Sequence, residues 1–459
     1  MSLHVVILAA GQGKRMHSAL PKVLHPVGGK PMLERVVDAA KALSPEAIHV
    51  VIGHQGDDIQ AALSGLPVHW VFQSEQLGTG HAVMQALSSI PASSHVLVLS
   101  GDVPLIKTQT LKALVQKATD YDNVSLVLLS ALLDDPTGLG RLIRDDRGDI
   151  VAIVEEKDAN EHQRRIAEVY TGTCVARAAD FSRWLPALSS NNAQGEYYLT
   201  DIIAMAAAES GRIVSFEVPD VLEVQGVNHR IQLQQVERAL QLRLADQLME
   251  AGVTLADASR LDVRGELQCG RDVFIDVNVV FKGRVVLGDH VSIGPNCEIT
   301  DVSIAAGTHV YANSVLEASE IGPECSVGPF ARLRPGTVLG ARCKLGNFVE
   351  TKNAVFDVGS KANHLTYLGD VTIGKAVNIG AGTITCNYDG ANKHQTVIED
   401  GVFIGSDTQL VAPVTIGQHA TIGAGSTIRK SVPAHELTLT ESKQKTVQGW
   451  IRPKKNIDL

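Results

Sequence analysis

The first half of the chain alternates short apolar runs with amphipathic segments. Apolar positions recur at helical spacing over 32–43 and 80–87. Runs rich in Val, Ile and Leu occur at 4–10, 47–53, 68–73, 95–100 and 124–129. This alternation predicts an α/β domain over residues 1–228, with a mostly parallel sheet, helices on both faces and a ligand site at the carboxyl ends of the strands.

A helix is expected to follow this domain. Between residues 229 and 253, five apolar residues recur at helical spacing with charged residues between them, and Gly252 suits the end of a helix. The five are Leu233, Val236, Leu240, Leu244 and Leu248. We interpret 229–253 as a connecting helix between two domains.

From residue 261 to about 430 the sequence repeats every six residues, and Gly follows most of the repeated apolar positions. A helix would spread such a repeat around its surface, whereas a triangular parallel β-coil places one aliphatic side chain per face inward. The repeat predicts a left-handed parallel β-helix within a domain at 254–459, with a loop at 387–395 and a polar tail from Ser431. The repeated positions are Ile275, Phe281, Leu287, Ile293, Ile299, Ile321, Val327, Leu333, Leu339, Leu345, Ile404, Leu410, Ile416, Ile422 and Ile428.

Composition narrows the classes of partner. The 459 residues include 41 Lys+Arg and 50 Asp+Glu, so the formal charge is 41 − 50 = −9, and the one dense basic segment is Arg452-Pro-Lys-Lys455. A polyanion binder needs a basic face, so we expect neither a nucleic-acid nor a membrane partner. The six Cys residues form no CxxC pair, and the first apolar run lacks a basic flank, which together favour a reducing, cytoplasmic location.

A glycine-rich loop follows the first predicted strand. The segment LAAGQGKRM at 8–16 exposes backbone N–H groups to phosphate oxygens, and Lys14, Arg15 and Lys22 supply positive charge. The loop matches neither the dinucleotide fingerprint nor a Walker A loop, because Met16 replaces the third Gly and Arg15 follows Gly-Lys. A tight β-to-α turn with solvated basic residues is the alternative reading.

Two further segments are candidates for binding nucleotide. Asp102 follows the apolar run at 95–99, where a carboxylate suits Mg²⁺ on a triphosphate, although it could also cap the next helix. The run QSEQLGTG at 73–80 offers amides and a hydroxyl to a base and ribose, although it could be only a loop and a helix cap.

Charged and aromatic residues interrupt the hexads within about three turns of the coil. A coil of this kind favours aliphatic residues and Gly, so Arg334, Lys352, His364 and Tyr367 depart from the pattern. A lone His is usually structural. Its basic and aromatic neighbours favour a functional role for His364.

Several motifs precede and accompany the hexads, and the set covers nearly the whole chain. They are LAAGQGKRM with Pro21-Lys22, QLGTGHA at 76–82, GDVPL at 101–105, GLGR at 138–141, GEYYLTD at 195–201, and Gly226-Val-Asn228. This set resembles the bacterial bifunctional N-acetylglucosamine-1-phosphate uridylyltransferase / glucosamine-1-phosphate N-acetyltransferase family. The resemblance implies a Rossmann-like nucleotidyltransferase domain, a connecting helix and a left-handed β-helix.

For the first domain, the resemblance implies UTP as substrate, Mg²⁺ on Asp102 and Asn228, and Arg15 and Lys22 as catalytic cations on the phosphates. Gly140, Glu155 and Thr171 are implied at the sugar, where Tyr170 departs from the Asn common in relatives. The implied set around UTP and the product is Leu8, Ala9, Ala10, Gly11, Gly13, Lys22, Gln73, Gly78, Thr79, Asp102, Gly140, Glu155, Thr171 and Asn228.

For the coil, the resemblance implies His364 as general base and acetyl-CoA as acetyl donor. Glucosamine phosphate is implied on Arg334, Lys352, Tyr367 and Asn378, and Asn363 is a small departure beside the base. Glu441 stands where relatives place an Arg for the CoA phosphates, so we predict that Lys443, or a basic residue of a neighbouring chain, replaces it. The implied acetyl-CoA residues are Ala381, Asn387, Tyr388, Ser406 and Ala424.

The resemblance also implies a homotrimer assembled through the β-helix. One alternative is a sugar-phosphate nucleotidyltransferase whose coil serves only regulation or assembly. Another is a binding protein whose first domain senses nucleotide and whose coil is a scaffold. Fold alone does not distinguish these functions.

Overall fold

A computed structural model describes residues 2–120, 123–209 and 211–453. Lys454 and Lys455 of the basic C-terminal segment lie outside the described residues. The chain forms two compact units that divide between Arg243 and Leu244. The division falls inside helix α8 (Arg230–Glu250), within the segment 229–253 where a connecting helix was expected.

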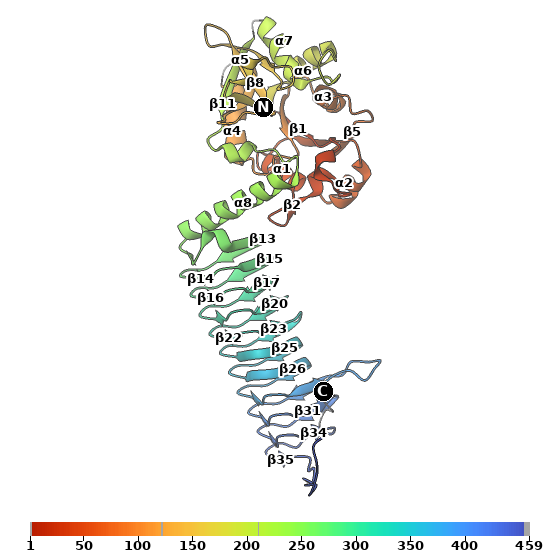
Figure 1. Cartoon of the computed structure of the whole chain (residues 1–459), viewed down its shortest axis with the longest axis vertical. Coiled ribbons are helices and arrows are strands. Elements are labelled where there is room, and N and C mark those ends of the chain that lie inside the picture. The colour runs from red at the N-terminus through yellow and green to blue at the C-terminus, as the bar shows by residue number, and fades with distance from the viewer. Residues whose placement is uncertain (1, 121–122, 210, 454–459) are drawn as a thin grey trace, which may run out of the picture. The chain divides into compact units, whose positions relative to one another are not determined.

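The first unit is built on a mixed sheet (Figure 1), in the order β11-β7-β10-β6-β1-β4-β5. Neighbouring strands are parallel except at β10, which runs antiparallel to both β6 and β7. The prediction of a mostly parallel sheet is confirmed along this path, while β10, β8 and β9 make antiparallel pairings that the pattern did not predict. The strands are β1 (Leu3–Leu8), β4 (Ala47–Ile52), β5 (His69–Phe72), β6 (His95–Ser100), β7 (Val124–Leu132), β10 (Glu168–Arg177) and β11 (Arg212–Glu217). β2 (Pro26–Val27) and β3 (Lys30–Pro31) form a separate hairpin. The hairpin of β8 (Gly140–Arg144) and β9 (Ile150–Val154) joins the sheet, because β8 pairs with β10.

Helices cover both faces of this sheet, and the side chains of β1 show why. Val5 and Ile7 pack into one apolar layer with α1 and α4, while Val6 packs into the other layer with α3, α6 and α7. A strand buried on both faces reads as a continuous apolar run, as the sequence does here. The helices are α1 (Met32–Lys41), α2 (Gly56–Ala62), α3 (Thr79–Leu87), α4 (Thr108–Thr119), α5 (Glu161–Arg164), α6 (Ala178–Trp184) and α7 (Ile202–Ala208).

The carboxyl ends of β1 and β6 meet at the centre of the sheet. Leu8 is paired with Ser100, and the Gly101 N–H donates to the Leu8 carbonyl at 2.9 Å. A Cβ at Gly101 would lie 3.1 Å from that carbonyl oxygen, so the close approach favours glycine. This pairing places the residue after Gly101, Asp102, beside the loop that follows β1.

Helix α8 ends in a glycine cap. The Gly252 N–H donates to the Met249 carbonyl and the Val253 N–H to the Leu248 carbonyl, both at 3.0 Å, while Gly252 adopts a φ of +95°. This is the Schellman arrangement, in which glycine takes the positive φ that ends the helix. The expectation that Gly252 ends the helix is confirmed.

The second unit is a parallel β-coil of 24 paired strands, from β12 (Thr254–Leu255) to β35 (Leu437–Thr438). All fifteen repeated apolar residues are at most 3% exposed, so the hexad prediction is confirmed. Most strands contain two or three residues, and successive turns of the coil pair in parallel (Figure 1). Longer strands are β13 (Leu261–Cys269), β15 (Val279–Leu287), β25 (Lys344–Phe356) and β26 (Lys361–Ile373).

Pairing defines how many residues make one turn of the coil. Ser326 pairs with Lys344, Lys344 with Lys361 and Lys361 with Asn378, which gives turns of 18, 17 and 17 residues. Asn378 pairs with Phe403, 25 residues later. The additional residues form the loop predicted at 387–395, where Tyr388 and Lys393 make an antiparallel bridge.

One corner of the coil changes chemistry along its length. Asn278, Asn296 and Asn313 adopt left-handed φ values near +59°, and their amides hydrogen-bond from turn to turn at 2.9 and 3.3 Å. Asn tolerates this conformation well. The next three turns place Phe330, Phe348 and Leu365 at the same corner, with φ values of +56°, +57° and +47°, and these side chains are 48%, 57% and 65% exposed. We call these three residues the apolar corner.

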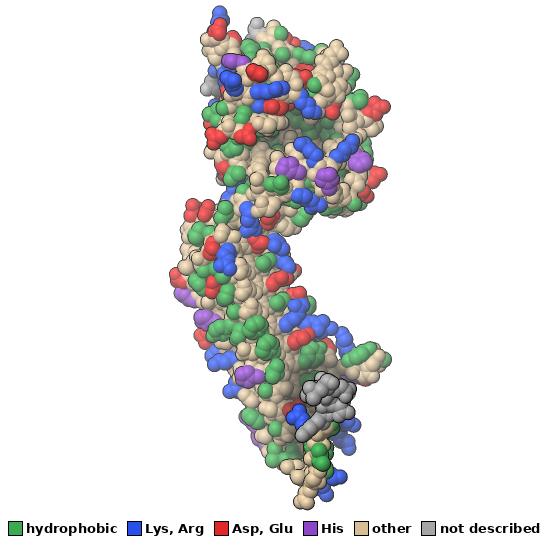
Figure 2. Space-filling model, in the orientation of Figure 1, with side chains coloured by type: hydrophobic (Ala, Val, Ile, Leu, Met, Phe, Trp, Pro, Cys, Tyr) green, Lys and Arg blue, Asp and Glu red, His purple; other side chains and the backbone are tan. Residues whose placement is uncertain are grey.

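Among the residues that the structure describes, the face shown in Figure 2 has no large region of one charge. Lys/Arg and Asp/Glu side chains are interspersed over the face of both units seen in Figure 2. All six Cys residues carry free thiols. Within the described residues, no helix is both long and apolar enough to cross a membrane.

Candidate active sites

The loop after β1 is held tightly against Lys22. Gly13 adopts a φ of +61°, and a Cβ there would lie 2.7 Å from the Lys22 Cβ. Short helical turns follow at Lys14–Met16 and Lys22–Leu24. The tight fit at Gly13 lets the loop backbone and the lysine occupy the same edge of the sheet, where both can reach one anionic ligand.

Lys22, Asp102 and Asn228 form one polar group. The Lys22 ammonium lies 2.5 Å from the Asp102 Oδ2, and it donates to the Asn228 Oδ1 at 3.4 Å. The Lys22 and Asp102 side chains are only 13% and 21% exposed. A carboxylate and an amide oxygen thus converge on one cation, and hard oxygen donors of this kind fit Mg²⁺.

No group of three His, Cys, Asp or Glu side chains gathers as a metal site in the part of the chain that the structure describes. Asp102 and Asn228 alone offer two protein oxygens. Mg²⁺ commonly uses one or two protein ligands and completes its shell with substrate phosphates and water. The donor set therefore fits a metal that is shared with a phosphate substrate.

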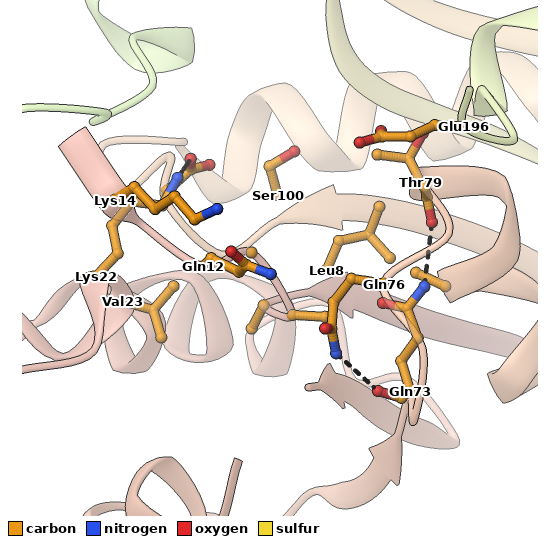
Figure 3. Close-up of a pocket in the computed structure, with 16 residues that line it drawn as sticks. Leu8, Gln12, Lys14, Lys22, Val23, Gln73, Gln76, Thr79, Ser100 and Glu196 are labelled. Atoms are coloured by element: carbon orange, nitrogen blue, oxygen red, sulfur yellow. Dashed lines mark hydrogen bonds and ion pairs between the residues drawn. The ribbon is translucent and has the colours of Figure 1, made fainter. Parts of the chain in front are cut away.

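A first cavity of about 520 Å³ is lined by Lys22 and Asp102 of this group. Figure 3 shows Lys14 and Lys22 on one side of the cavity and Gln73, Gln76 and Thr79 on the opposite side. The cavity thus has a cationic end and an amide end. Of the predicted UTP residues, those that line it are Leu8, Ala9, Ala10, Gly11, Lys22, Gln73, Gly78, Thr79 and Asp102.

The amide end is rigidly built. Gln73 is 3% exposed, and its Nε2 donates to the Gly78 carbonyl at 3.2 Å, while Gln76 Nε2 donates to the Gln73 carbonyl at 3.1 Å. Gly78 has a φ of +114°, which is essentially restricted to glycine. Thr79 begins α3, and its hydroxyl accepts from the Leu199 N–H at 3.0 Å. These bonds fix the polar groups that face the cavity.

A second cavity of about 510 Å³ shares Ser100 and Asp102 with the first. It is lined by Arg15, Thr171 and Asn228 together with several apolar residues. Arg15 thus lies on the side of Asp102 away from the amide end. Asp102 stands where the two cavities meet, so ligands in each would approach one another beside it.

Gly140 and Glu155 line neither cavity wall. They lie together, since a Cβ on Gly140 would be 3.5 Å from the Glu155 Oε1. Burial raises the pKa of Glu155, and a hydrogen bond from the Thr200 hydroxyl at 3.2 Å offsets part of this. Tyr170 packs in the core, and burial raises its pKa well above the usual value. Its neighbour Thr171 reaches the second cavity instead.

The coil carries a separate basic cluster. Arg334 Nη1 donates to the Glu350 Oε1 at 2.9 Å, and Lys352 follows Glu350 by two residues on β25. Repulsion from Lys393, with a smaller contribution from Arg334, lowers the pKa of Lys352. Three cations thus gather beside Tyr367, which pairs with Glu350 on the next turn of the coil.

The buried Asn387 side chain lies next to this cluster and contacts Asp370. It is 8% exposed, and its amide donates to the Asp370 Oδ2 at 2.5 Å. Burial opposes ionisation of Asp370, but hydrogen bonds from Asn353 and Asn387 outweigh it and lower the pKa of Asp370. The loop carrying Tyr388 and Lys393 is thereby anchored to β26.

His364 stands at the corner of the coil immediately before Leu365. Its imidazole is exposed, and it follows Asn347 by one turn. The same corner continues over the next three turns towards the C-terminus. Its backbone hydrogen bonds run from the N–H of Gly382 to Leu365, of Asp407 to Ala381 and of Gly425 to Ser406. His364, Ala381, Ser406 and Ala424 therefore occupy equivalent positions on successive turns. The side chains of Ala381, Ser406 and Ala424 are small.

Asn378 and Lys443 lie apart from this cluster, whereas Tyr388 bridges Lys393 at its margin. Asn378 pairs with Lys361, so it stands on the face of the coil that precedes the His364 corner, whereas Tyr367 stands on the face that follows it. Tyr388 is 61% exposed in its loop. Lys443 is exposed in the tail, as is Glu441.

Matches to known proteins cover both units. Family models match as MobA-like NTP transferase domain over 5–157, GMPPB C-terminal domain over 263–361 and bacterial transferase hexapeptide (six repeats) over 395–430. The bifunctional protein GlmU of Legionella pneumophila (strain Lens) is 61% identical over 457 residues, which is 99% of both chains. The chain belongs to the GlmU family. The bifunctional protein GlmU of Marinobacter nauticus (strain ATCC 700491 / DSM 11845 / VT8) is 56% identical over 453 residues, again 99% of both chains.

GlmU family membership confirms the resemblance drawn from the motifs, and the fold class with it. A nucleotidyl transferase from Methanothermobacter thermautotroptrophicus also matches, at 18% identity and a TM-score of 0.37 over 55% of this chain and 99% of that one. This likeness is too distant to add to the GlmU assignment.

The structure also brings forward residues to which the sequence analysis gave no role. Gln76 and Glu196 line the first cavity, and Lys393 and Glu350 belong to the coil cluster. Glu196 lies within the motif at 195–201 and Gln76 within QLGTGHA, so both motifs carried a signal. Lys393 lies in a loop without periodicity, where only the three-dimensional fold brings it to Lys352.

Proposed function

We infer that this GlmU family member is a bifunctional enzyme that makes UDP-N-acetylglucosamine. Its coil N-acetylates glucosamine 1-phosphate with acetyl-CoA, and its first unit then transfers a uridylyl group from UTP to the product, releasing pyrophosphate. Identity of 61% to a bifunctional protein over 99% of the chain carries this inference, together with two polar clusters in separate units.

In the first cavity, UTP lies with its phosphates at the cationic end and its base at the amide end. Lys14 and Lys22 face the phosphates, while Gln73, Gln76 and Thr79 face the base and ribose. This polarity matches a ligand with a negative chain at one end and a neutral ring at the other. It supports the roles predicted for Lys22 and Gln73.

The sugar phosphate occupies the second cavity, so its phosphate meets the UTP α-phosphate at Asp102. A phosphate oxygen attacks the α-phosphorus, the bond to the β-phosphate oxygen breaks, and pyrophosphate leaves. Arg15 reaches this junction from the sugar side and Lys22 from the nucleotide side. Both stabilise charge that develops during transfer, and alignment of the two phosphates contributes the rest.

Asp102 and Asn228 are the residues that would hold Mg²⁺. When bound, Mg²⁺ supplies positive charge to the phosphate oxygens of the transferring group. The two side chains also orient Lys22, which they both contact. Gly140 follows Leu139, which lines the second cavity, and Glu155 lies beside Gly140, so both stand at the margin where the N-acetyl sugar would extend.

In the coil, Arg334, Lys352 and Lys393 bind the phosphate of glucosamine 1-phosphate. His364 removes a proton from the sugar amine as the nitrogen attacks the thioester carbonyl of acetyl-CoA. The C–S bond then breaks, and the CoA thiolate takes up the proton that His364 releases. Exposure leaves the imidazole free to contact substrate.

The corner above His364 supports binding of a long, thin donor. Ala381, Ser406 and Ala424 continue the corner for three turns with small side chains. Turns of a parallel coil are about 4.8 Å apart, so these residues span roughly 14 Å from the imidazole. That length suits the pantetheine arm of acetyl-CoA, whose thioester then lies at His364.

We propose that the enzyme is a homotrimer through its β-helix. Asn378 and Tyr367 stand on different faces of one coil, so a neighbouring chain is needed to bring a predicted residue from one face opposite the other. The apolar corner supports the same proposal. Bulky residues with positive φ cost of order 1–2 kcal/mol each, and a second copy covering them accounts for their exposure.

An assay of the full chain with glucosamine 1-phosphate, acetyl-CoA, UTP and Mg²⁺ tests the function. Free thiol and pyrophosphate are followed separately. His364→Ala is expected to abolish thiol release, and Asp102→Ala to abolish pyrophosphate release from supplied N-acetylglucosamine 1-phosphate. Wild-type protein that releases neither product would overturn the proposal, and one signal alone would overturn the bifunctional assignment.

A further inference from the structure

The segment 220–228 supplies a wall of the second cavity and ends in Asn228. Its turn η5 spans Val221–Val224, and Val224, Gln225 and Gly226 line the cavity. The opposite wall near the junction comes from the loop 101–107, which carries Asp102. The relative position of Asp102 and Asn228 therefore depends on how this segment is attached to that loop.

Glu223 makes the attachment. The side chain is 1% exposed, although the nearby Val221 and Leu222 are 41% and 44% exposed. Its Oε2 accepts from the Thr110 hydroxyl at 2.6 Å and from the Lys107 N–H at 3.3 Å, and its Oε1 lies 2.9 Å from the Lys107 ammonium. All partners belong to the first turn of α4 and the residue before it.

This contact also satisfies the start of α4. No side chain of the flanking residues caps this helix, whose first N–H groups lack partners within it. A carboxylate at a helix N-terminus is stabilised by the helix dipole. Glu223 supplies that carboxylate from a segment distant in sequence, so the cap of α4 is at the same time a fastening for 220–228.

Two further bonds flank the Glu223 contact. The Val227 N–H donates to the Asp102 carbonyl at 3.0 Å. At the other end of the segment, Asp220 lies 3.3 Å from the Lys107 ammonium and 3.2 Å from the Arg243 guanidinium. The segment is thus fixed to the loop 101–107 at each end and at Glu223.

We propose that Glu223 is a positioning residue of the uridylyl-transfer site, whose buried carboxylate holds Asn228 beside Asp102. The proposal rests on the proposed function, in which these two residues hold Mg²⁺. Glu223 touches neither cavity, so it acts through the backbone of residues 224–228. Loosening this segment separates the two metal-holding oxygens and disturbs the sugar wall, while the amide end of the first cavity stays intact.

Glu223→Gln tests this with little change in shape. A glutamine has one acceptor oxygen, so its NH₂ group must face either the Lys107 ammonium or the donors Thr110 and Lys107 N–H, and at least one bond is lost. The loss of one such hydrogen bond corresponds to about a tenfold change in a binding constant. We expect the half-saturating Mg²⁺ concentration and the KM for N-acetylglucosamine 1-phosphate to rise about tenfold, with the KM for UTP within about twofold.

Metal affinity is also measured without turnover. Mn²⁺ binding is followed by electron paramagnetic resonance with a non-hydrolysable UTP analogue bound, and Glu223→Gln is expected to weaken it by a similar factor. Glu237→Gln is the matched control, because Glu237 also accepts a backbone N–H, that of Gly28 at 2.6 Å, but lies on α8 away from both cavities. The control is expected to keep wild-type metal dependence.

Thr110 gives a milder probe in case Glu223→Gln does not fold. Thr110→Val removes one donor to Glu223 and should shift the Mg²⁺ dependence in the same direction, while Thr110→Ser keeps the hydroxyl and should restore it. Acetyl transfer by the same preparations reports on the coil and should not change.

The outcomes separate the possibilities. Lower activity and a lower melting temperature with unchanged Mg²⁺ dependence and unchanged Mn²⁺ affinity would show a merely structural role and overturn the proposal. Full activity of Glu223→Gln with wild-type constants would overturn it too. Wild-type protein without UTP-dependent pyrophosphate release would instead refute the proposed function.

Discussion

Three histidines on neighbouring strands give this protein a specific weakness to acid. His4, His49 and His69 lie side by side on β1, β4 and β5, with ring centroids 5.5 and 5.4 Å apart, and His4 Nδ1 lies 3.2 Å from His49 Nε2. His49 is 2% exposed. Burial, followed by repulsion from His4 and His69, lowers the pKa of His49 from 6.5 to about 4.

The direction of the effect follows from the two pKa values. The unfolded chain binds a proton on His49 below pH 6.5, whereas the folded chain resists it down to about pH 4. Stability from this residue is therefore complete above pH 6.5 and falls as the pH drops through that window. By proton linkage, the free energy of unfolding falls by about 2 kcal/mol at pH 5 and by about 3 kcal/mol below pH 4.

Denaturant unfolding of wild type and His49→Gln at pH 7.5 and pH 5.0 measures this loss. Trp70 and Trp184 report on the first unit, and Trp450→Phe in both proteins removes the tryptophan of the tail. The free energy of unfolding of wild type should fall by about 2 kcal/mol more than that of the variant. His419→Gln, in the exposed His419–His435 pair of the coil, is the control. Equal losses in wild type and His49→Gln would refute the reasoning.

Three further predictions concern the proposed sites. Lys443→Ala should raise the KM for acetyl-CoA several-fold and leave pyrophosphate release unchanged, with Lys445→Ala as control; an unchanged KM would exclude Lys443. Phe348→Asn should keep or raise the melting temperature of the coil, because Asn tolerates its positive φ, yet should shift the sedimentation coefficient towards monomer; an unchanged oligomer would contradict a role for the apolar corner. Gly78→Ala should destabilise the first unit by about 1–3 kcal/mol and raise the KM for UTP, since its Cβ would lie 2.6 Å from the Tyr197 carbonyl; a wild-type melting temperature would refute this.

The sequence predicted elements whose side chains repeat with a clear period. The hexads work because one residue per face is excluded from water, so residues such as Ile293 and Leu410 must be apolar whatever the rest of the turn contains. The strands β1 and β6 were equally plain, because both faces of each are buried. Asp102 followed directly from the end of β6.

Features that depend on distant segments were not predictable in this way. The antiparallel direction of β10 depends on how its ends connect, which a local pattern does not encode. In the sequence Glu223 looks like a solvated acid between Leu222 and Val224, and only the fold brings α4 onto it. Lys393 reaches Lys352 through a loop without periodicity, and the pattern did not separate Arg15 from Lys22, which line different cavities.

The regular pairing of the coil gives every turn the same rise along its axis. Each turn adds a fixed rise of about 4.8 Å, so the distance along the coil from His364 to the tail depends on the number of turns between them. A single turn inserted or deleted after Ala381 would move the tail by about 4.8 Å while leaving the His364 imidazole in place. In the proposed acetyl-transfer site, the number of turns therefore sets the span for the acetyl donor, and an enzyme with one more turn should accept a correspondingly longer thioester carrier.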